Sequence, residues 1–517
     1  MLSMSSALQR ARRQHASRPA IIEPERIHSW AEHVQRVACL AGALLKMGLA
    51  PGARIGIVSR NSFRQAELLH AGYWSGVIPV PVNVRLAPRE IAFVLKDADC
   101  ALLAIDPLLL ALLDRDELAP WREHAFVLGA NGAGRRSHDE LIDSAAALPP
   151  RDADENDDAI LLYTGGTTGR AKGVRLTHRN IACNGLQVGL TLGIRHDDIY
   201  LHVAPMFHSA DLLGSALTLT GGAHVYLPEF NPTAFLAAIE RHRVSFTMLA
   251  PTMLIMVLQH ADFAKFDLSS LRIQVYGSSP MAETWIRRAL EALPATSVTQ
   301  GYGLTETAPI LSFFEHRHHL EALASGNTAR LACAGKTLPG VDLRIVDDAG
   351  REVPSGASGE VIVRGPNVTP GYYGLPEANR ECFRDGWFHT GDIGREDGEG
   401  FLYLLDRKKD MIVTGGENVY SSEVEAALFT HPGVAEAAVI GVPDETYGEA
   451  VFAVVIPKPG VTLDAPGLIA HCRGTIGGYK IPRRFAFVDA LPKSALGKVL
   501  KADLRQRFGG KGATGAL

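Results

Sequence analysis

The chain has 517 residues, which exceeds one ordinary domain and predicts two or more folded units. Hydrophobic residues make up 46% and charged residues 21%, a normal balance for a globular protein. No apolar run reaches the ~18 residues of a membrane-spanning helix, so no transmembrane segment is expected. The net charge is −4 without a long basic block, which argues against nucleic acid as a partner.

The six cysteines are scattered along the chain without CxxC spacing, which argues against a disulfide framework or a zinc site. Reduced thiols favour a cytoplasmic location. The first residues carry Arg10, Arg12 and Arg13 but no apolar signal core, and predict an amphipathic surface helix, with a transit peptide as the minor alternative.

Short strand-like runs alternate with helical patterns between Arg54 and Ala130. This alternation predicts a βαβ sheet with helices on both faces. The polar segment 135–156 is expected to be a linker. The predicted strands are residues 54–59, 78–84, 101–106 and 124–129, and the predicted helix is 62–75.

A glycine-rich stretch, YTGGTTGRAKGV at residues 163–174, follows a short apolar run that is expected to be a buried strand. Glycines allow close backbone approach, and consecutive N–H groups, threonine hydroxyls and Lys172 favour an anion. The stretch therefore predicts polyphosphate binding, with a surface loop as the structural alternative. It is not a Walker A loop, because Gly173 follows Lys172 where that motif has Ser or Thr.

A second block in α/β style covers residues 198–305. In open α/β sheets, ligands lie beyond the carboxyl ends of strands, and three informative segments, 205–208, 277–280 and 301–307, follow predicted strands. The predicted strands are 199–205, 223–228, 244–250 and 273–277, and the predicted helices are 209–220, 232–242, 252–262 and 281–293.

Each of these segments has a chemical role available and a structural alternative. The serines of 277–280 could cap the following helix. Tyr302 could pack on adenine and Glu306 could hold magnesium, which prefers oxygen ligands, or the segment is a solvated turn. His208 could orient a substrate or be structural. The histidine-rich residues 315–319 lack a clean metal spacing and are expected to form a surface loop.

After Gly335 the sequence alternates apolar and polar residues with turn signals, which predicts a small β subdomain. Asp392 could accept both ribose hydroxyls or form an Asx turn. The charged run 407–410 is the best domain boundary, because boundaries fall in exposed polar segments. Beyond it we expect a helix over 421–430 capped by Ser421 or Ser422, strands over 434–442 and 450–456, and a helix over 465–474.

Several segments resemble motifs of the adenylate-forming superfamily. The stretch at 163–174 resembles its phosphate loop, TSGTTGxPKG, with a glycine for the serine and Ala171 for the proline, and these departures leave the phosphate donors intact. QGYGLTET resembles the adenine and magnesium segment, and PMFHS the segment near the acyl channel. WFHTGD resembles the ribose clamp, DRKKD the hinge, and LPKSALGKVLK the terminal motif with a catalytic lysine. The match spans almost the whole chain in the expected order and favours the acyl-CoA synthetase branch.

The resemblance implies an α/β fold with a large N-terminal domain of two α/β subdomains plus a small β subdomain. A small, mobile α+β C-terminal domain would follow. The implied borders are 1–406 for the AMP-binding domain, 407–409 for the hinge, 410–508 for the C-terminal domain and 509–517 for a disordered tail.

The implied function is that of an ATP-dependent acid:CoA ligase. A carboxylate and ATP would give acyl-AMP and pyrophosphate, and the thiol of coenzyme A would then displace AMP. The implied cofactors and partners are ATP, Mg²⁺, coenzyme A and a small carboxylic acid, and a homodimer is left open. The alternative is a stand-alone adenylation enzyme that loads an acyl or amino acid onto a separate carrier protein. A non-catalytic relative is disfavoured by the intact Lys498, Glu306 and Asp392.

The resemblance also assigns roles to individual residues. The catalytic group comprises Lys498, Glu306 as the magnesium ligand, Thr305 and His208. Lys409 is the hinge residue. The nucleotide- and CoA-binding set comprises Thr164, Gly165, Gly166, Thr167, Thr168, Gly169, Lys172, Gly277, Ser278, Ser279, Gly301, Tyr302, Gly303, Asp392, Arg407, Gly415, Gly416 and Glu417.

The acyl pocket is expected to be lined by small or apolar residues, which favours a medium-chain fatty or aromatic acid. Arg330 is the one candidate cation for a second carboxylate. The expected lining is 207–211, 248–252, Gly277, 301–303 and 307–311.

Overall fold

The computed structural model describes residues 2–164, 171–279, 281–414, 417–444, 446–473, 475–493 and 499–509. The chain divides into two compact units. The larger is Met1–Asp342 with Val363–Phe388, and the smaller is Leu343–Ile362 with His389–Leu517. Both are mixed α/β, so the predicted fold class is confirmed. The predicted borders at 406–410 differ from this division and stay a prediction.

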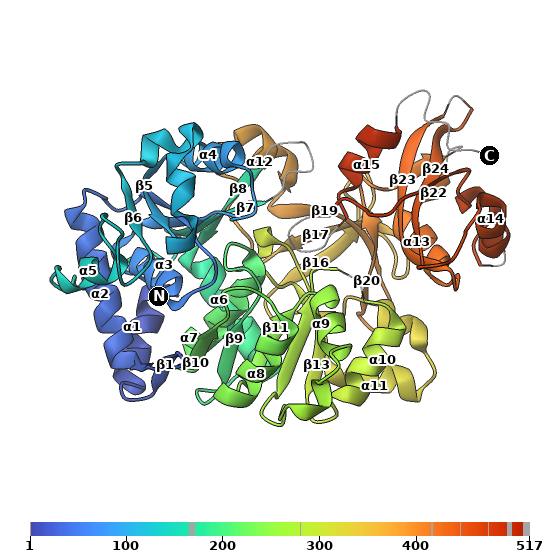
Figure 1. Cartoon of the computed structure of the whole chain (residues 1–517). Coiled ribbons are helices and arrows are strands. Elements are labelled where there is room, and N and C mark those ends of the chain that lie inside the picture. Colours follow the sequence, from blue (N-terminus) through green and yellow to red (C-terminus); the bar gives the residue numbers. More distant parts are fainter. Residues whose placement is uncertain are drawn as a thin grey trace. The chain divides into compact units, whose positions relative to one another are not determined.

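The larger unit is built around a nine-stranded sheet whose inner strands are parallel. Parallel strands of one sheet need crossover connections, and helices α8 (Pro232–His242) and α9 (Pro251–Leu258) lie in two of these connections (Figure 1). The strand order is β15 (Lys336–Thr337), β14 (Ser312–Phe314), β13 (Ser297–Tyr302), β12 (Ile273–Gly277), β11 (Phe246–Leu249), β9 (Ile199–His202), β10 (Ala223–Tyr226), β1 (Pro19–Ile22) and β2 (Ile27–Ser29).

A second, four-stranded parallel sheet comes from the first third of the chain. Its order is β4 (Ile78–Pro81), β3 (Arg54–Val58), β5 (Cys100–Ile105) and β6 (Ala125–Val127), as the alternating pattern predicts. Helix α3 (Phe63–Ser75) begins after Ser62, whose hydroxyl accepts from the N–H of Gln65, and it ends at Gly76 in the left-handed conformation. It packs against α2 (Trp30–Lys46).

An antiparallel hairpin of β7 (Asp158–Thr164) and β8 (Lys172–Thr177) lies between these sheets in the sequence. Its register places Thr164 opposite Lys172, and buried Leu162 and Val174 anchor it in the core. The two ends of the predicted phosphate loop are therefore held opposite each other.

Three local predictions for the larger unit need correction. Helix α1 (Met4–Gln14) forms as predicted, but it buries Met4, Leu8 and Ala11 rather than lying only on the surface. Helix α5 (His138–Asp143) interrupts the predicted linker. The expected surface loop 315–319 opens helix α11 (His316–Ala324) instead. His318 and His319 are buried there against Phe314, and the His319 ring shares a 2.8 Å hydrogen bond with the Tyr276 hydroxyl.

The other helices of the larger unit fit their predicted ranges to within a few residues where a prediction exists. Helix α10 (Glu283–Ala292) begins after Ala282 and has no side-chain cap, so capping by Ser278 or Ser279 is wrong. The remaining elements among the described residues are α4 (Pro88–Asp97), α6 (His178–Leu192), α7 (Ser215–Thr220), α12 (Pro376–Cys382), β18 (Phe383–Arg384) and several short 3₁₀ segments, among them η3 (Ser209–Gly214) and η5 (Thr305–Thr307).

The smaller unit is an α+β structure. Strands β16 (Asp342–Val346), β17 (Gly359–Arg364) and β19 (Trp387–Glu396) each have residues in both units, and β19 pairs with β20 (Leu402–Arg407). A further sheet has the order β22 (Glu417–Val419), β21 (Ile412–Thr414), β24 (Gly448–Pro457) and β23 (Val434–Asp444), with β25 (Arg484–Phe487) parallel to β24.

The helices of the smaller unit are α13 (Ser421–Phe429), α14 (Ala465–Arg473) and α15 (Lys501–Phe508). The predicted cap of α13 is wrong, because the cap residue is Tyr420 and Ser421 is already helical. The Ser421 hydroxyl donates to the Asp406 carboxylate at 2.6 Å instead. Val424, Leu428, Val439 and Val455 form the core between α13 and its sheet.

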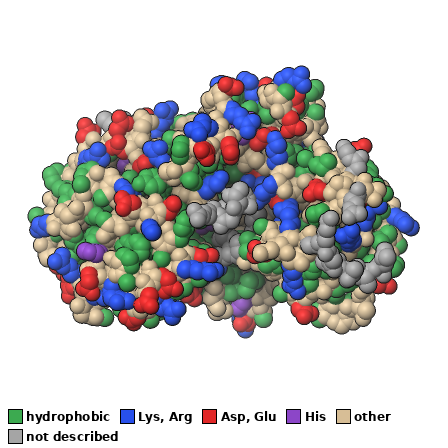
Figure 2. Space-filling view, turned by 90° about the horizontal axis from the view of Figure 1, so that it is seen from above, with side chains coloured by type: hydrophobic (Ala, Val, Ile, Leu, Met, Phe, Trp, Pro, Cys, Tyr) green, Lys and Arg blue, Asp and Glu red, His purple; other side chains and the backbone are tan. Residues whose placement is uncertain are grey.

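Charged side chains of both signs are interspersed over the face drawn in Figure 2. In the part of the chain that the structure describes, no helix has both the length and the apolar composition needed to cross a membrane.

Candidate active site

The predicted adenine segments lie together at the carboxyl ends of β12 and β13. The two strands place Gly277 opposite Gly301. A Cβ on Gly277 would be 2.4 Å from the Gly301 carbonyl oxygen, so this close backbone approach requires glycine. Ser278 has φ +73°, and both Ser278 and Ser279 are exposed. At the sheet edge where a ligand is expected, the two glycines therefore leave the backbone without side chains, and serine hydroxyls flank it.

The turn after β13 is fixed by hydrogen bonds of its own. The Thr307 hydroxyl donates to the carbonyls of Leu304 at 2.9 Å and Pro309 at 3.0 Å, and Asn367 donates to the Thr307 carbonyl at 2.9 Å. A Cβ on Gly303 would be 1.9 Å from the Pro309 oxygen, so glycine is required there too. Half-buried Tyr302 ends the strand. Thr305 and Glu306 are therefore presented from a rigid turn.

Glu306 is 9% exposed, and its carboxylate has one neutral donor. The Tyr372 hydroxyl donates to Glu306 Oε1 at 2.7 Å, and the N–H of Thr369 donates to the Glu306 carbonyl at 2.8 Å. Burial, followed by the charge of Glu306, raises the pKa of Tyr372 far above its ordinary value, which keeps the hydroxyl protonated. Among the described residues, no cationic side chain forms an ion pair with Glu306. Its second oxygen is suited to a hard cation such as Mg²⁺.

Lys172 approaches the same tyrosine from the hairpin. Its ammonium lies 5.0 Å from the centre of the Tyr372 ring, within the range of a cation–π interaction. Thr164, opposite Lys172, is half-buried. The predicted loop residues Gly165, Gly166, Thr167, Thr168 and Gly169 lie outside the described residues.

His208 and Thr305 are brought close by the start of η3. The His208 ring accepts from the N–H of Ala210 at 3.2 Å, so it has a local structural role whatever else it does. The next residue, Ser209, shares a 3.0 Å hydrogen bond with the Thr305 hydroxyl. The predicted acyl-channel segment thus contacts the turn that carries Glu306.

In the smaller unit, the predicted ribose residues form a pair. Asp392 and Arg407 are opposite each other on β19 and β20, and Arg407 Nε lies 2.7 Å from Asp392 Oδ1. Asp392 is inside a strand, so the Asx-turn alternative is wrong. Lys409 is exposed in the turn after β20, and Glu417 begins β22. Gly415, Gly416 and Lys498 lie outside the described residues.

Tyr372 was not among the residues predicted from the sequence. It lies 66 residues from Glu306 in the chain, so no local spacing connects the two. The only available signal was an aromatic pair after Pro370-Gly371, in a stretch otherwise typical of a turn.

A lysine and a threonine at the ends of a glycine-rich hairpin, and a carboxylate after a parallel strand, define an adenylate-forming enzyme. The smaller unit has its own acid–base pair, Asp392 with Arg407. The chain belongs to the AMP-binding enzyme family. Residues 8–373 match the family described as AMP-binding enzyme, and residues 423–498 match its C-terminal domain.

Relatives cover nearly the whole chain. Feruloyl-CoA synthase of an Amycolatopsis species is 38% identical over 486 residues, which is 93% of this chain and 94% of that protein. Indoleacetate–CoA ligase of Aromatoleum aromaticum is 38% identical over 493 residues, 94% of each protein. The structure of o-succinylbenzoate coenzyme A synthetase from Bacillus subtilis with ATP and magnesium matches with a TM-score of 0.84 and 30% identity, covering 96% of this chain and 99% of that one.

The chain is therefore an enzyme, an ATP-dependent acid:CoA ligase of the AMP-forming acyl-CoA synthetase class. Its use of ATP, Mg²⁺ and coenzyme A agrees with the sequence prediction. The alternative of loading a separate carrier protein is not favoured by these relatives.

Proposed function

We propose that the enzyme activates an aromatic carboxylic acid and transfers it to coenzyme A. The observation that carries this proposal is the 38% identity, over more than nine-tenths of the chain, to ligases named for feruloyl-CoA and indoleacetate. An amino acid substrate is disfavoured because Asp211, three residues after His208, is buried and bonded to His202 at 2.7 Å. Medium-chain fatty acids are the contrasting class, since the predicted lining is apolar.

The larger unit would bind ATP. Thr164 and Lys172, with the loop 165–169, would hold the outer phosphates, and the turn 277–279 with residues 301–303 would frame adenine. Thr305 would contact the α-phosphate, where its hydroxyl is positioned by Ser209. His208 would orient the acid, whose carboxylate oxygen attacks the α-phosphorus and releases pyrophosphate. Positioning and charge stabilisation supply most of this catalysis.

Glu306 would hold Mg²⁺, which neutralises phosphate charge when it is bound. The residues fit this role, because Glu306 is a nearly buried carboxylate with no cationic partner among the described residues. A buried carboxylate without such a partner is suited to bind a divalent cation.

The smaller unit would supply the remaining groups. Asp392 would accept the ribose hydroxyls, with Arg407 fixing the orientation of its carboxylate. Lys498 would bridge the attacking carboxylate and the α-phosphate, since an ammonium is a compact charge with three donors. Lys409 would be the pivot that lets Lys498 leave and Gly415, Gly416 and Glu417 line the thiol channel. The CoA thiolate then attacks the acyl carbon, and AMP leaves with its bonding electron pair.

The experiment is an acid panel with two readouts on the purified chain. Acid-dependent exchange of labelled pyrophosphate into ATP reports the first half-reaction, and thioester formation with free coenzyme A reports the second. Hydroxycinnamic and arylacetic acids are expected to exceed octanoic and hexanoic acids by at least about tenfold in kcat/KM. Equal or better use of the alkyl acids would refute the aromatic class, and no exchange with any acid would refute adenylate formation.

A homodimer and a cytoplasmic location remain predictions. Light scattering of the full chain would test the first, because a mass near twice 55.6 kDa is expected for a dimer. Fractionation of the source cells would test the second.

A further inference from the structure

Tyr372 joins two groups of the candidate Mg·ATP site that come from different parts of the chain. Its hydroxyl donates to Glu306 Oε1 at 2.7 Å, and its ring faces the Lys172 ammonium at 5.0 Å. The residue is only 6% exposed. One side chain therefore contacts both the candidate metal ligand and the candidate phosphate ligand.

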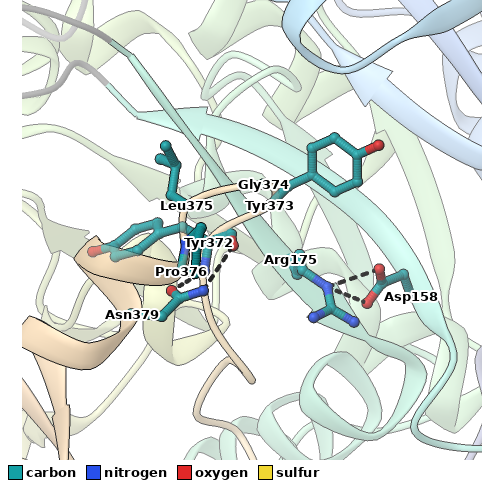
Figure 3. Close-up of a pocket in the computed structure, with 8 residues that line it drawn as sticks. All are labelled: Asp158, Arg175, Tyr372, Tyr373, Gly374, Leu375, Pro376 and Asn379. Atoms are coloured by element: carbon teal, nitrogen blue, oxygen red, sulfur yellow. Dashed lines mark hydrogen bonds and ion pairs between the residues drawn. The ribbon is translucent and has the colours of Figure 1, made fainter.

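The backbone fixes this tyrosine independently of its hydroxyl. Tyr372 forms a β-bridge with Val174, and the N–H of Tyr373 donates to the Gly173 carbonyl at 2.8 Å, so the loop lies along β8 next to Lys172. Asn379 accepts from the Tyr372 N–H at 2.7 Å and donates to its carbonyl at 3.0 Å (Figure 3).

Gly371 is required for this clamp. Its φ is +136°, and a Cβ there would lie 2.7 Å from Asn379 Oδ1. Loss of the Tyr372 hydroxyl alone should therefore leave the loop and the ring in place.

The chemistry of the contact suits a metal ligand. A carboxylate has two oxygens, and the hydroxyl occupies one, which sets the direction of the other. A neutral donor leaves the negative charge of Glu306 available, whereas an arginine or lysine partner would cancel it. The ring face meanwhile gives the Lys172 ammonium a partner other than Glu306.

We propose that Tyr372 is a positioning residue that orients Glu306 toward the Mg²⁺ of Mg·ATP. The inference rests on the proposed nucleotide site and adds a residue to it. Hydrogen bonds to carboxylates that bind metals typically change affinity or activity by about 10–100-fold.

The matched variants are Tyr372→Phe and Tyr373→Phe. The two tyrosines are adjacent, and Figure 3 shows their side chains pointing to opposite sides of the loop. The Tyr373 ring packs under Arg54, 5.5 Å from its guanidinium, and lines a pocket of about 380 Å³ with Asp158 and Arg175. The same change at Tyr373 removes a hydroxyl from the same loop without touching Glu306.

Calorimetric titration of ATP with and without Mg²⁺ is the binding readout. For Tyr372→Phe, we expect unchanged ATP affinity in EDTA, about a tenfold loss of the affinity gained with Mg²⁺, and about a tenfold higher KM for Mg²⁺. At saturating Mg²⁺, kcat should return to within about threefold of the wild-type value. Tyr373→Phe should match the wild type, and melting curves check that both variants fold.

A double-mutant cycle separates an effect of Tyr372 on the orientation of Glu306 from a general destabilisation of the site. In a Glu306→Gln background, Tyr372→Phe should no longer change the Mg²⁺ dependence, because the group through which it acts is gone. An undiminished effect in that background, or equal shifts for the two tyrosine variants, would overturn the inference. If the wild type binds Mg·ATP and Tyr372→Phe does not alter that binding, the inference fails alone. If the wild type shows no Mg²⁺-dependent ATP binding, the proposed nucleotide site fails with it.

Discussion

Two carboxylates buried in the larger unit, Glu67 and Glu306, have opposite surroundings. Glu67 is fully buried and receives Arg36 Nε at 2.6 Å, Arg36 Nη2 at 3.0 Å and the His138 ring at 2.8 Å. Glu306 is nearly as buried but has Tyr372 as its neutral donor. Lys172, the nearby cation, faces that donor's ring.

The difference distinguishes a carboxylate that stabilises the fold, Glu67, from one that we propose binds a ligand, Glu306. Burial works to raise the pKa of Glu67, but hydrogen bonds from His138 and Arg36 outweigh it and hold that pKa far below its ordinary value. Both oxygens of Glu67 are used, so this carboxylate has no capacity for a ligand. Glu306 has a carboxylate oxygen without a cationic partner among the described residues, at the strand end where we propose that ATP binds, and such incomplete satisfaction is typical of functional sites.

The largest expected effect on catalysis comes from removing the negative charge of Glu306. Glu306→Gln should lower the rate of adenylate formation by about 10²–10³-fold, because one preorganised electrostatic contact to the reacting phosphates is lost. Its melting temperature should stay within about 2 °C of the wild type, since no cation among the described residues is left unpaired. Pyrophosphate exchange measures the rate of adenylate formation, and differential scanning fluorimetry measures the melting temperature. A stability loss as large as that of the Glu67 variant would break the comparison.

Glu67→Gln should show the reverse pattern. Removing one partner of a buried ion pair leaves Arg36 with Asp139 as its remaining acid, at 3.1 Å, and typically costs about 3 kcal/mol of unfolding free energy. The folded fraction should retain near-normal kcat and KM for ATP. Chemical denaturation gives the stability, and active-site titration normalises the rates. A catalytic defect without destabilisation would contradict a structural role.

Acidification should also act on the Glu67 cluster, which consists of Glu67, Arg36, His138 and His33, whose Nδ1 lies 3.9 Å from Glu67 Oε1. Burial lowers the pKa of His33 to about 4, although Glu67 opposes this. Below the ordinary value near 6.5, the unfolded chain takes up a proton that folded His33 does not. Stability therefore falls as pH drops from 6.5 to 4, by about 1.4 kcal/mol per pH unit for this group. Glu67, whose pKa is depressed, loses its contribution only below about pH 4.5.

Chemical denaturation at pH 7, 6 and 5, which gives the unfolding free energy at each pH, would test this pH dependence. His33→Gln should flatten the dependence by about 1 kcal/mol per unit between pH 6 and 5. The remaining slope belongs to other buried histidines, of which His70 and His224 also have pKa values lowered by burial. A slope that His33→Gln leaves unchanged would show that His33 is not neutral in the folded protein.

Much of the fold could be predicted from the sequence, and so could Glu306, but not its partner Tyr372. Alternating apolar runs located β3, β4, β5 and β6, and the QGYGLTET segment identified Glu306, because strands and loop motifs are local patterns. Tyr372 was missed because its partner is distant in the chain. The buried pair His318 and His319 was mistaken for a loop, because their polar residue types gave no sign that both rings pack against Phe314.

An exposed glutamate–arginine pair shows how small the contribution of such a contact to unfolding free energy should be. On α10, Arg287 Nη2 lies 2.7 Å from Glu283 Oε1, with both side chains more than two-fifths exposed. Water and salt screen this pair, and holding two long side chains costs entropy, so Glu283→Gln should change unfolding free energy by less than about 0.5 kcal/mol. The same substitution at Glu67 should cost several times more, although both carboxylates contact an arginine at closely similar distances. Chemical denaturation of the two variants side by side would decide this, and equal losses would mean that burial is not what gives the Glu67 cluster its strength.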